Sequence, residues 1–196
     1  MESNDDLLNE KDNKNGNCLI DNKYIILDKK GSGLTSVVFK VKPLKDTNDQ
    51  KIILTAKVEK ILSEKKQKLI KIPLKEIFTH EINILNTINK KNSPYKSYIA
   101  NIKNSGIGEV KRPNKPTTTH NYIILEYAER GCLYDYIYFP EKGFREEEYA
   151  KLLFFRILLG IKACHEAKIC NRDIKLENIL LDETFNPKIC DWFLRN

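Results

Sequence analysis

The pattern of apolar and polar residues predicts β-strands from about residue 21 onward. Three segments combine β-branched and other apolar residues with polar ones, at 23–30, 36–44 and 51–60. The turn-forming stretches GSG and TNDQ separate them. Strands joined this closely are most simply an antiparallel meander, so we expect a small β-rich lobe here.

A helical pattern follows Pro73, in residues 74–91. The apolar residues with helical spacing are Ile77, Phe78, Ile82, Leu85 and Ile88. Two further strands are predicted at 105–110 and 121–128. The basic, proline-containing segment 111–120 between them is predicted to be an exposed loop.

The last third of the chain has a different pattern. Residues 132–138 predict a short helix, and 145–167 predict a long one with acidic residues in its first turn. The apolar face of the long helix is wide and requires a cover. Residues 178–190 predict two short strands around a turn at DETFNP.

These elements suggest an α+β chain with three parts. Residues 1–20 are rich in Asn, Asp and Lys and predict a flexible tail. Residues 21–127 form the β-rich lobe. Residues 128–196 begin a helical lobe, after a connector at 126–131.

Composition narrows the function classes. The net charge of +7 comes largely from the lysine-rich run 57–76, where acids are interspersed, so a solvated surface is the simple interpretation. No nucleic-acid-binding motif accompanies this charge, and no apolar run is long enough to span a bilayer, so we expect neither partner. The five cysteines show no CxxC pair and the N-terminus shows no secretory signal, which predicts reduced thiols in the cytoplasm or nucleus.

Two candidate sites lie in the β-rich lobe. Gly31, Ser32 and Gly33 lie between two predicted strands, where glycines let backbone N–H groups approach a polyanion, although glycine pairs also occur in ordinary tight hairpins. Lys57 lies within a predicted strand, and Glu81 on the predicted helix is its candidate partner. Taken separately, each of these two charges is better explained as an ordinary surface residue.

The segment NRDIKLEN carries the most specific chemistry. Asp173 is placed to accept a proton from an attacking hydroxyl, and Lys175 to neutralise charge on a transferred phosphoryl group. Asn178 and the later Asp191 are oxygen ligands suited to Mg²⁺.

In this order the motifs resemble the first half of the eukaryotic protein kinase signature, over residues 24–191. At its position in the motif, Lys175 resembles the residue of the serine/threonine branch of this family. The resemblance implies a protein-kinase-like fold, with a small antiparallel β lobe, one major helix and an incomplete helical larger lobe. It also implies ATP and Mg²⁺ as ligands.

The resemblance assigns a role to each matching position. Asp173, Lys175, Lys57 and Glu81 are catalytic by resemblance, and Asn178 and Asp191 hold the metal. Leu125 is the gatekeeper, and the backbones of Glu126 and Ala128 face adenine. The residues assigned to the nucleotide are Gly31, Ser32, Gly33, Val38, Ala56, Lys57, Leu125, Glu126, Ala128 and Leu180. For Val38, Ala56 and Leu180 the alternative is an ordinary core position.

The sequence departs from the family pattern near both ends of the catalytic segment. Asn171 replaces a histidine and would need hydrogen-bond partners, whereas Trp192 and Phe193 replace phenylalanine and glycine. Thr35 and Ser36 replace an aromatic residue and a glycine. The sequence ends five residues after Asp191, so we expect apolar surface of the long helix to be exposed.

Three interpretations follow. The first is a serine/threonine protein kinase that moves the γ-phosphoryl group of ATP to a protein hydroxyl. The second is a catalytically inactive, ATP-binding pseudokinase or interaction module. The third is a truncated gene product. The sequence names no protein substrate or partner.

Overall fold

The computed structural model describes residues 18–45, 52–63, 67–68, 70, 72–113, 115–139 and 146–192. Contacts divide the chain into two compact units: unit 1 contains residues 1–79 and 103–127, and unit 2 contains residues 80–102 and 128–196. The division after residue 127 lies where the sequence predicts a domain boundary, but residues 80–102 group with unit 2.

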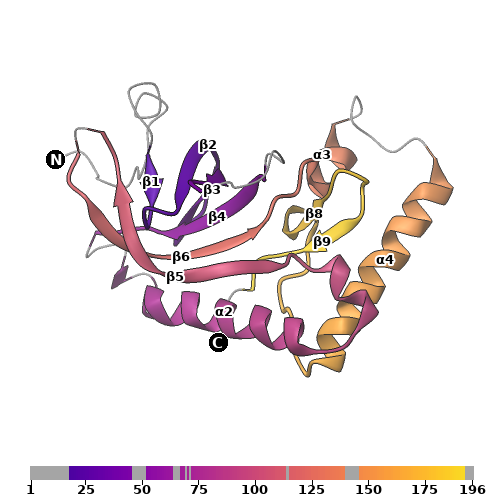
Figure 1. The fold of residues 1–196 in the computed structure, drawn as a ribbon. Coiled ribbons are helices and arrows are strands. Elements are labelled where there is room, and N and C mark those ends of the chain that lie inside the picture. The colour runs from indigo at the N-terminus through magenta and orange to yellow at the C-terminus, as the bar shows by residue number, and fades with distance from the viewer. Residues whose placement is uncertain are drawn as a thin grey trace. The chain divides into compact units, whose positions relative to one another are not determined.

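Unit 1 is built on one β-sheet (Figure 1). Its strands are β1 (Leu19–Ile20), β2 (Tyr24–Ser32), β3 (Ser36–Pro43), β4 (Leu54–Glu59), β5 (Ile102–Lys111) and β6 (Thr118–Glu126). Their order is β1-β2-β3-β4-β6-β5, and β1 pairs with both β2 and β5. The antiparallel pairing of β2 with β3 and of β3 with β4 confirms the predicted meander.

Two predicted boundaries in unit 1 are wrong. Cys18 is 0% exposed and β1 follows it directly, so the described end of the predicted tail, residues 18–20, belongs to the sheet. Residues 1–17 lie outside the described residues. The predicted loop at 111–120 also ends early, because β6 begins at Thr118 and His120 is buried. A two-residue strand and a buried histidine leave no periodic pattern in the sequence.

The core of unit 1 follows from strand alternation. Successive side chains of a strand point to opposite faces, so every second residue is buried on one face. The residues of β3, β4 and β6 that meet in this core are Val37, Phe39, Val41, Ala56, Val58, Tyr122 and Ile124. Val38 and Lys57 alternate with these residues and therefore face away from this core.

His120 connects β6 to the end of β4. Its Nδ1 lies 2.8 Å from the carbonyl oxygen of Glu59, and its Nε2 lies 2.7 Å from the hydroxyl of Thr118. Since a carbonyl oxygen only accepts, Nδ1 carries the hydrogen and Nε2 accepts from Thr118. Burial lowers the pKa of His120, and the hydrogen bond to Glu59 opposes this effect only in part.

Unit 1 is therefore expected to lose stability in mild acid. The lowered pKa means that the unfolded chain binds a proton near the ordinary value of 6.5 while folded His120 stays neutral, so stability falls as pH drops through 6.5. Thermal unfolding between about pH 8 and pH 5 measures this loss. His120→Gln should flatten the profile, and the exposed His165→Gln should leave it unchanged. Equal slopes in all three proteins would contradict the assignment.

Helix α2 (Leu74–Lys90) begins after Pro73, as predicted, and the division between the units falls within it. Its first apolar positions, Ile77 and Phe78, are buried. Glu81 shares the buried stripe and is 2% exposed. A carboxylate this deeply buried requires compensating polar contacts. Glu81 is therefore not an ordinary surface charge.

Unit 2 combines short strands with helices (Figure 1). Its elements are η1 (Pro94–Tyr98), β7 (Gly131–Cys132), α3 (Leu133–Tyr138), α4 (Glu147–Glu166), η2 (Leu176–Asn178), β8 (Ile179–Leu181) and β9 (Pro187–Ile189). The strands pair in the order β7-β8-β9. The short helix, the long helix and the two late strands confirm the sequence predictions, whereas β7 and both 3₁₀ helices were not predicted.

Helix α4 has one covered face and one exposed face. Leu153, Ile157 and Gly160 are buried. Phe154 and Phe155 remain 62% and 56% exposed, so part of the apolar surface of this helix is uncovered, as the sequence predicts. Across the described ranges, no helix has the length and apolar character needed to cross a membrane.

Gly160 allows β9 and η1 to approach α4 closely. A Cβ atom at this position would lie 2.9 Å from Cδ1 of Ile189 and 3.3 Å from the carbonyl oxygen of Tyr98. Ile189 ends β9, two residues before Asp191, and its carbonyl oxygen accepts a hydrogen bond from Ala100 N at 2.9 Å. The glycine thus positions the strand that leads to a predicted metal ligand.

Gly160→Ala is expected to destabilise unit 2 by about 1 kcal/mol. This value is the difference between an overpacking cost of about 1–3 kcal/mol and a helix-propensity gain of about 1 kcal/mol. Denaturant unfolding measures the net effect. Adding Ile189→Val removes the nearest methyl group, so the double variant should show a favourable coupling energy. A stabilised single variant would contradict the tight contact.

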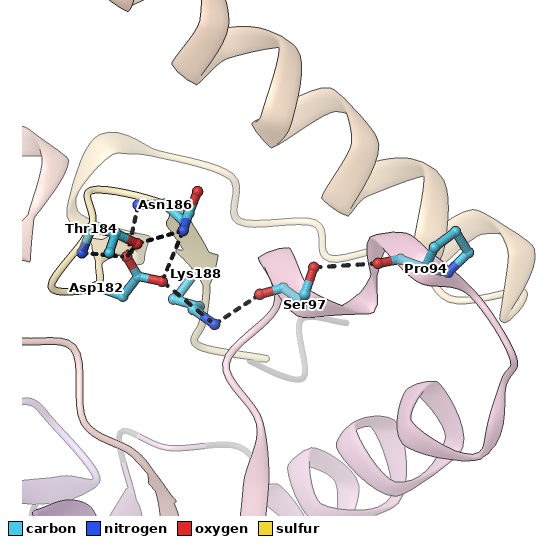
Figure 2. Close-up of polar contacts among 6 residues, drawn as sticks. All are labelled: Pro94, Ser97, Asp182, Thr184, Asn186 and Lys188. Atoms are coloured by element: carbon cyan, nitrogen blue, oxygen red, sulfur yellow. Dashed lines mark hydrogen bonds and ion pairs between the residues drawn. The ribbon is translucent and has the colours of Figure 1, made fainter.

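The turn between β8 and β9 is organised by Asp182 (Figure 2). Its carboxylate accepts hydrogen bonds from Thr184 N at 3.0 Å, from the Thr184 hydroxyl at 2.9 Å and from Asn186 N at 2.8 Å. Burial tends to raise the pKa of Asp182, but these hydrogen bonds and the charge of Lys188 lower it more, so the net shift is downward. Lys188 also donates to the carbonyl oxygen of Ser97 at 2.8 Å, which ties β9 to η1.

Candidate functional site

The predicted phosphate-contacting residues of unit 1 lie in one row across three strands. Gly31 of β2 pairs with Val38 of β3, Val38 pairs with Lys57 of β4, and Lys57 pairs with Ile123 of β6. Directly opposed residues point to the same face of an antiparallel sheet, so Val38 and Lys57 share one face. Ser32 follows Gly31 and pairs with Val37.

Open space adjoins the two glycines. A Cβ atom at Gly31 would meet nothing within 4 Å, and one at Gly33 would meet only Ser36 O, at 3.9 Å. Gly131 is the glycine with positive φ among those described, so neither Gly31 nor Gly33 is needed for a left-handed turn. Neither the packing around these two positions nor their backbone conformation therefore requires glycine.

The predicted role of Ala56 is corrected by the structure. Ala56 is 0% exposed and belongs to the core with Phe39 and Ile124, on the face opposite Lys57. Thr55 alternates with Ala56 and shares the face of Lys57. The period of two in the strand was visible in the sequence and would have identified Thr55.

The start of the predicted connector at 126–131, and Leu125 before it, continue the pairing of β6 with β4. Leu125 is 9% exposed and pairs with Thr55, and Glu126 pairs with Leu54. The Lys40 ammonium lies 4.9 Å from the ring centroid of Tyr127, which holds the end of unit 1 against β3. Ala128 is the first residue of this part of unit 2 and is half-buried.

Unit 2 brings together three of the predicted catalytic and metal-binding side chains. Asn178 Nδ2 donates to Asp173 Oδ2 and to the Asp173 carbonyl oxygen, both at 2.9 Å. Lys175 Nζ lies 3.0 Å from the same Oδ2. Because both Asn178 amide hydrogens are directed at Asp173, the amide oxygen of Asn178 is directed elsewhere.

Asn178 also connects this segment to Asp191. Cys190 N donates to the Asn178 carbonyl oxygen at 3.0 Å, and Cys190 Sγ contacts the same oxygen at 3.3 Å. Asp191 follows directly and has a positive φ of 62°, as does Arg172 beside Asp173. Non-glycine residues seldom adopt this conformation, and such strain concentrates at functional sites.

Two departures from the family pattern leave buried donors without acceptors in the described chain. Asn171 Oδ1 accepts from Asp173 N at 3.0 Å, but Asn171 Nδ2 has no partner there. Trp192 is 1% exposed, so its side chain has been accommodated, yet its Nε1 also lacks a described partner. Phe193 lies outside the described residues.

The remaining predicted residues lie in separate units. Leu180 is half-buried in β8 and pairs with Lys188 and Cys132. Glu81 belongs to unit 2 and Lys57 to unit 1, so their pairing stays a prediction.

A pocket of about 530 Å³ lies elsewhere in unit 1, at the end of β4. Its lining includes Lys60, Leu62, Lys75 and His120, and none of its lining residues was predicted from the sequence as a site residue.

Comparison with known proteins identifies the family. Residues 24–194 match the protein kinase domain. The chain belongs to the protein kinase family. The serine/threonine protein kinase OSK3 of Oryza sativa subsp. indica is 41% identical over 80 residues, which cover 41% of this chain and 15% of that protein.

Two further relatives agree. The SNF1-related protein kinase catalytic subunit alpha KIN12 of Arabidopsis thaliana is 45% identical over 75 residues, 38% of this chain and 15% of that protein. The NUAK family SNF1-like kinase 2 of Homo sapiens is 46% identical over 74 residues, 38% of this chain and 12% of that protein. By family, this kinase is of the serine/threonine type, and its matched part spans a minor fraction of each relative's length.

Alanine substitutions at Gly31 and Gly33 should separate ligand binding from folding. Each Cβ atom would enter open space, so the kinase should keep its stability or gain about 0.4–1 kcal/mol from reduced unfolded-state entropy. The same atoms should obstruct a phosphate chain and weaken MgATP binding in calorimetry. Gly108→Ala is the contrast, since its Cβ would lie 2.6 Å from Asp21 Cβ and should destabilise unit 1. Unimpaired MgATP binding in both loop variants would count against the loop assignment.

Proposed function

We propose that this chain binds MgATP and transfers the γ-phosphoryl group to serine or threonine hydroxyls of proteins. The observation that carries the proposal is the polar cluster of unit 2. The side chain of Asp173 is 13% exposed. Its Oδ2 accepts a hydrogen bond from Asn178 Nδ2 and forms an ion pair with Lys175 Nζ. A carboxylate held in one orientation is the group that proton acceptance from a hydroxyl requires.

Two features of the sheet support nucleotide binding by unit 1. The open space beside Gly31 and Gly33 leaves room for a phosphate chain next to the loop backbone, which is the use that phosphate-binding loops make of glycine. Val38, Thr55 and Leu125 provide apolar surface on the face that carries Lys57. We assign these side chains to the adenine and Lys57 to the α- and β-phosphates, with Glu81 as its partner.

The donor set of unit 2 fits a magnesium ion. Mg²⁺ prefers oxygen ligands, and the Asn178 amide oxygen and the Asp191 carboxylate are both of this type. The hydrogen bonds from Asn178 to Asp173 fix which amide atom remains for a metal. When bound, Mg²⁺ would neutralise negative charge on the phosphoryl oxygens.

Each residue of the cluster then has a step in the transfer. The substrate hydroxyl oxygen attacks the γ-phosphorus, the bond to the bridging oxygen of ADP breaks, and Asp173 takes the hydroxyl proton. Lys175, whose ammonium already lies beside Asp173, compensates charge on the moving phosphoryl group. Arg172 and Asp191, whose backbones have positive φ angles, flank these groups in the chain.

A second candidate is an ATP-binding interaction module without transfer activity. The unpartnered donors Asn171 Nδ2 and Trp192 Nε1 favour it, because each lies buried where the family pattern has another residue. A buried donor without an acceptor costs about 1–3 kcal/mol. The exposed Phe154 and Phe155 of α4 would suit an interaction module.

The two candidates differ in one measurement. Transfer of labelled phosphate from ATP to a generic basic protein should be detectable with the wild-type chain and fall at least about 10²-fold in Asp173→Asn, which removes the proton acceptor. Glu166→Gln removes an exposed carboxylate of the same unit and should have no effect.

Ligand binding separates the remaining outcomes. MgATP should raise the thermal unfolding midpoint of the wild-type chain, since it binds only the folded state, and should not do so in Lys57→Met. Binding without transfer in the wild type would favour the interaction module. If MgATP neither raises the unfolding midpoint nor supports phosphate transfer, nucleotide binding is refuted altogether.

A further inference from the structure

The loop between β2 and β3 is held from outside the hairpin. Within the loop, Gly33 N donates to the Ser36 carbonyl oxygen at 2.9 Å. From beyond the end of β4, Lys60 N donates to the Thr35 carbonyl oxygen at 2.9 Å, and Lys60 Nζ donates to the Gly33 carbonyl oxygen at 2.7 Å. One residue thus bonds to both sides of the loop.

The two bonds of Lys60 have different origins. The backbone bond extends the β3–β4 ladder, in which Ser36 pairs with Glu59, by one residue. Any residue except proline could make it. The side-chain bond reaches across the loop to the residue that ends the glycine pair, and it requires a long side chain with a terminal donor. Lys60 lies in the lysine-rich run that the sequence suggested was solvated surface.

The same loop has one buried side and one exposed tip. Thr35 and Ser36 are 7% and 6% exposed, whereas Leu34 is 59% exposed. The backbone at Thr35 and Ser36 is therefore fixed by burial and by the ladder. On the other side, β2 ends at Ser32, which pairs with Val37. Beyond the ladder, Gly33 is held by the bond from its own N–H to the Ser36 carbonyl oxygen and by the bond from Lys60 Nζ to its carbonyl oxygen.

We propose that Lys60 is a positioning residue for the phosphate chain of ATP. Its ammonium holds the Gly33 carbonyl oxygen, which keeps the backbone N–H groups of the glycine loop ordered before the nucleotide arrives. The inference rests on the proposed function, in which this loop contacts the phosphates. It adds a residue that the motif comparison does not supply.

The energetic argument sets the size of the effect. For a ligand that needs an ordered loop, the apparent affinity is the intrinsic affinity multiplied by the fraction of molecules in which the loop is ordered. One exposed hydrogen bond from a charged group limits that effect to about three- to tenfold in affinity. The loss should depend on the phosphates, because adenosine does not contact the loop.

The experiment compares Lys60→Met with the wild-type chain in calorimetric titrations of ADP and of adenosine. We expect ADP affinity to fall about three- to tenfold and adenosine affinity to stay unchanged. Without nucleotide, amide hydrogen exchange at Gly33 should accelerate, since its N–H lies inside the loop that Lys60 holds. The exchange measurement excludes a direct contact between Lys60 and phosphate as the whole cause.

Two variants act as controls. Lys60→Arg keeps a long cationic donor and should restore most of the affinity. Lys75→Met removes the same charge from the other lysine of the 530 Å³ pocket and should change neither readout. Equal ADP affinity and equal Gly33 exchange in Lys60→Met and wild type would overturn the inference while leaving the proposed function intact. If the wild-type chain binds neither ligand, the proposed function fails first.

Discussion

The amide of Asn178 is the contact on which the candidate site of unit 2 depends. Its side chain holds Asp173 through two hydrogen bonds, and its carbonyl oxygen holds Cys190, the residue before Asp191. The segment that contains Asp173 and the segment that leads to Asp191 are thereby joined at one buried residue, through its side chain on one side and its backbone carbonyl on the other. Since the amide is buried, its hydrogen bonds do not compete with water, and breaking them would leave polar atoms unpaired.

The rest of unit 2 supports this contact from outside. The carboxylate of Asp182 closes the turn between β8 and β9, and Lys188 ties β9 to η1. Gly160 lets α4 approach Ile189, so β9 is held on the side of the helix as well. The kinase thus fixes the backbone before Asp191 from three directions, which allows Asp191 to keep its strained conformation.

In unit 1 the corresponding constraint is strand alternation. Burial of Phe39, Ala56 and Ile124 on one face forces Val38 and Lys57 to the other. Two of the departures of this kinase from the family pattern, Asn171 and Trp192, lie in unit 2. Asn171 and Trp192 occupy buried positions in which each keeps an unpaired donor among the described residues.

The sequence by itself determined the element types, the family and the order of the chemical groups. Apolar periodicity located α2, α4 and the strands from β2 to β6, because the burial of one face repeats at the period of each element. Tertiary structure decided what periodicity does not encode. The hydrogen bond from Lys60 to Gly33 and the entry of Cys18 into the core depend on neighbours distant in the chain. Such contacts arise only when strands are placed side by side, and no local pattern of residues records them.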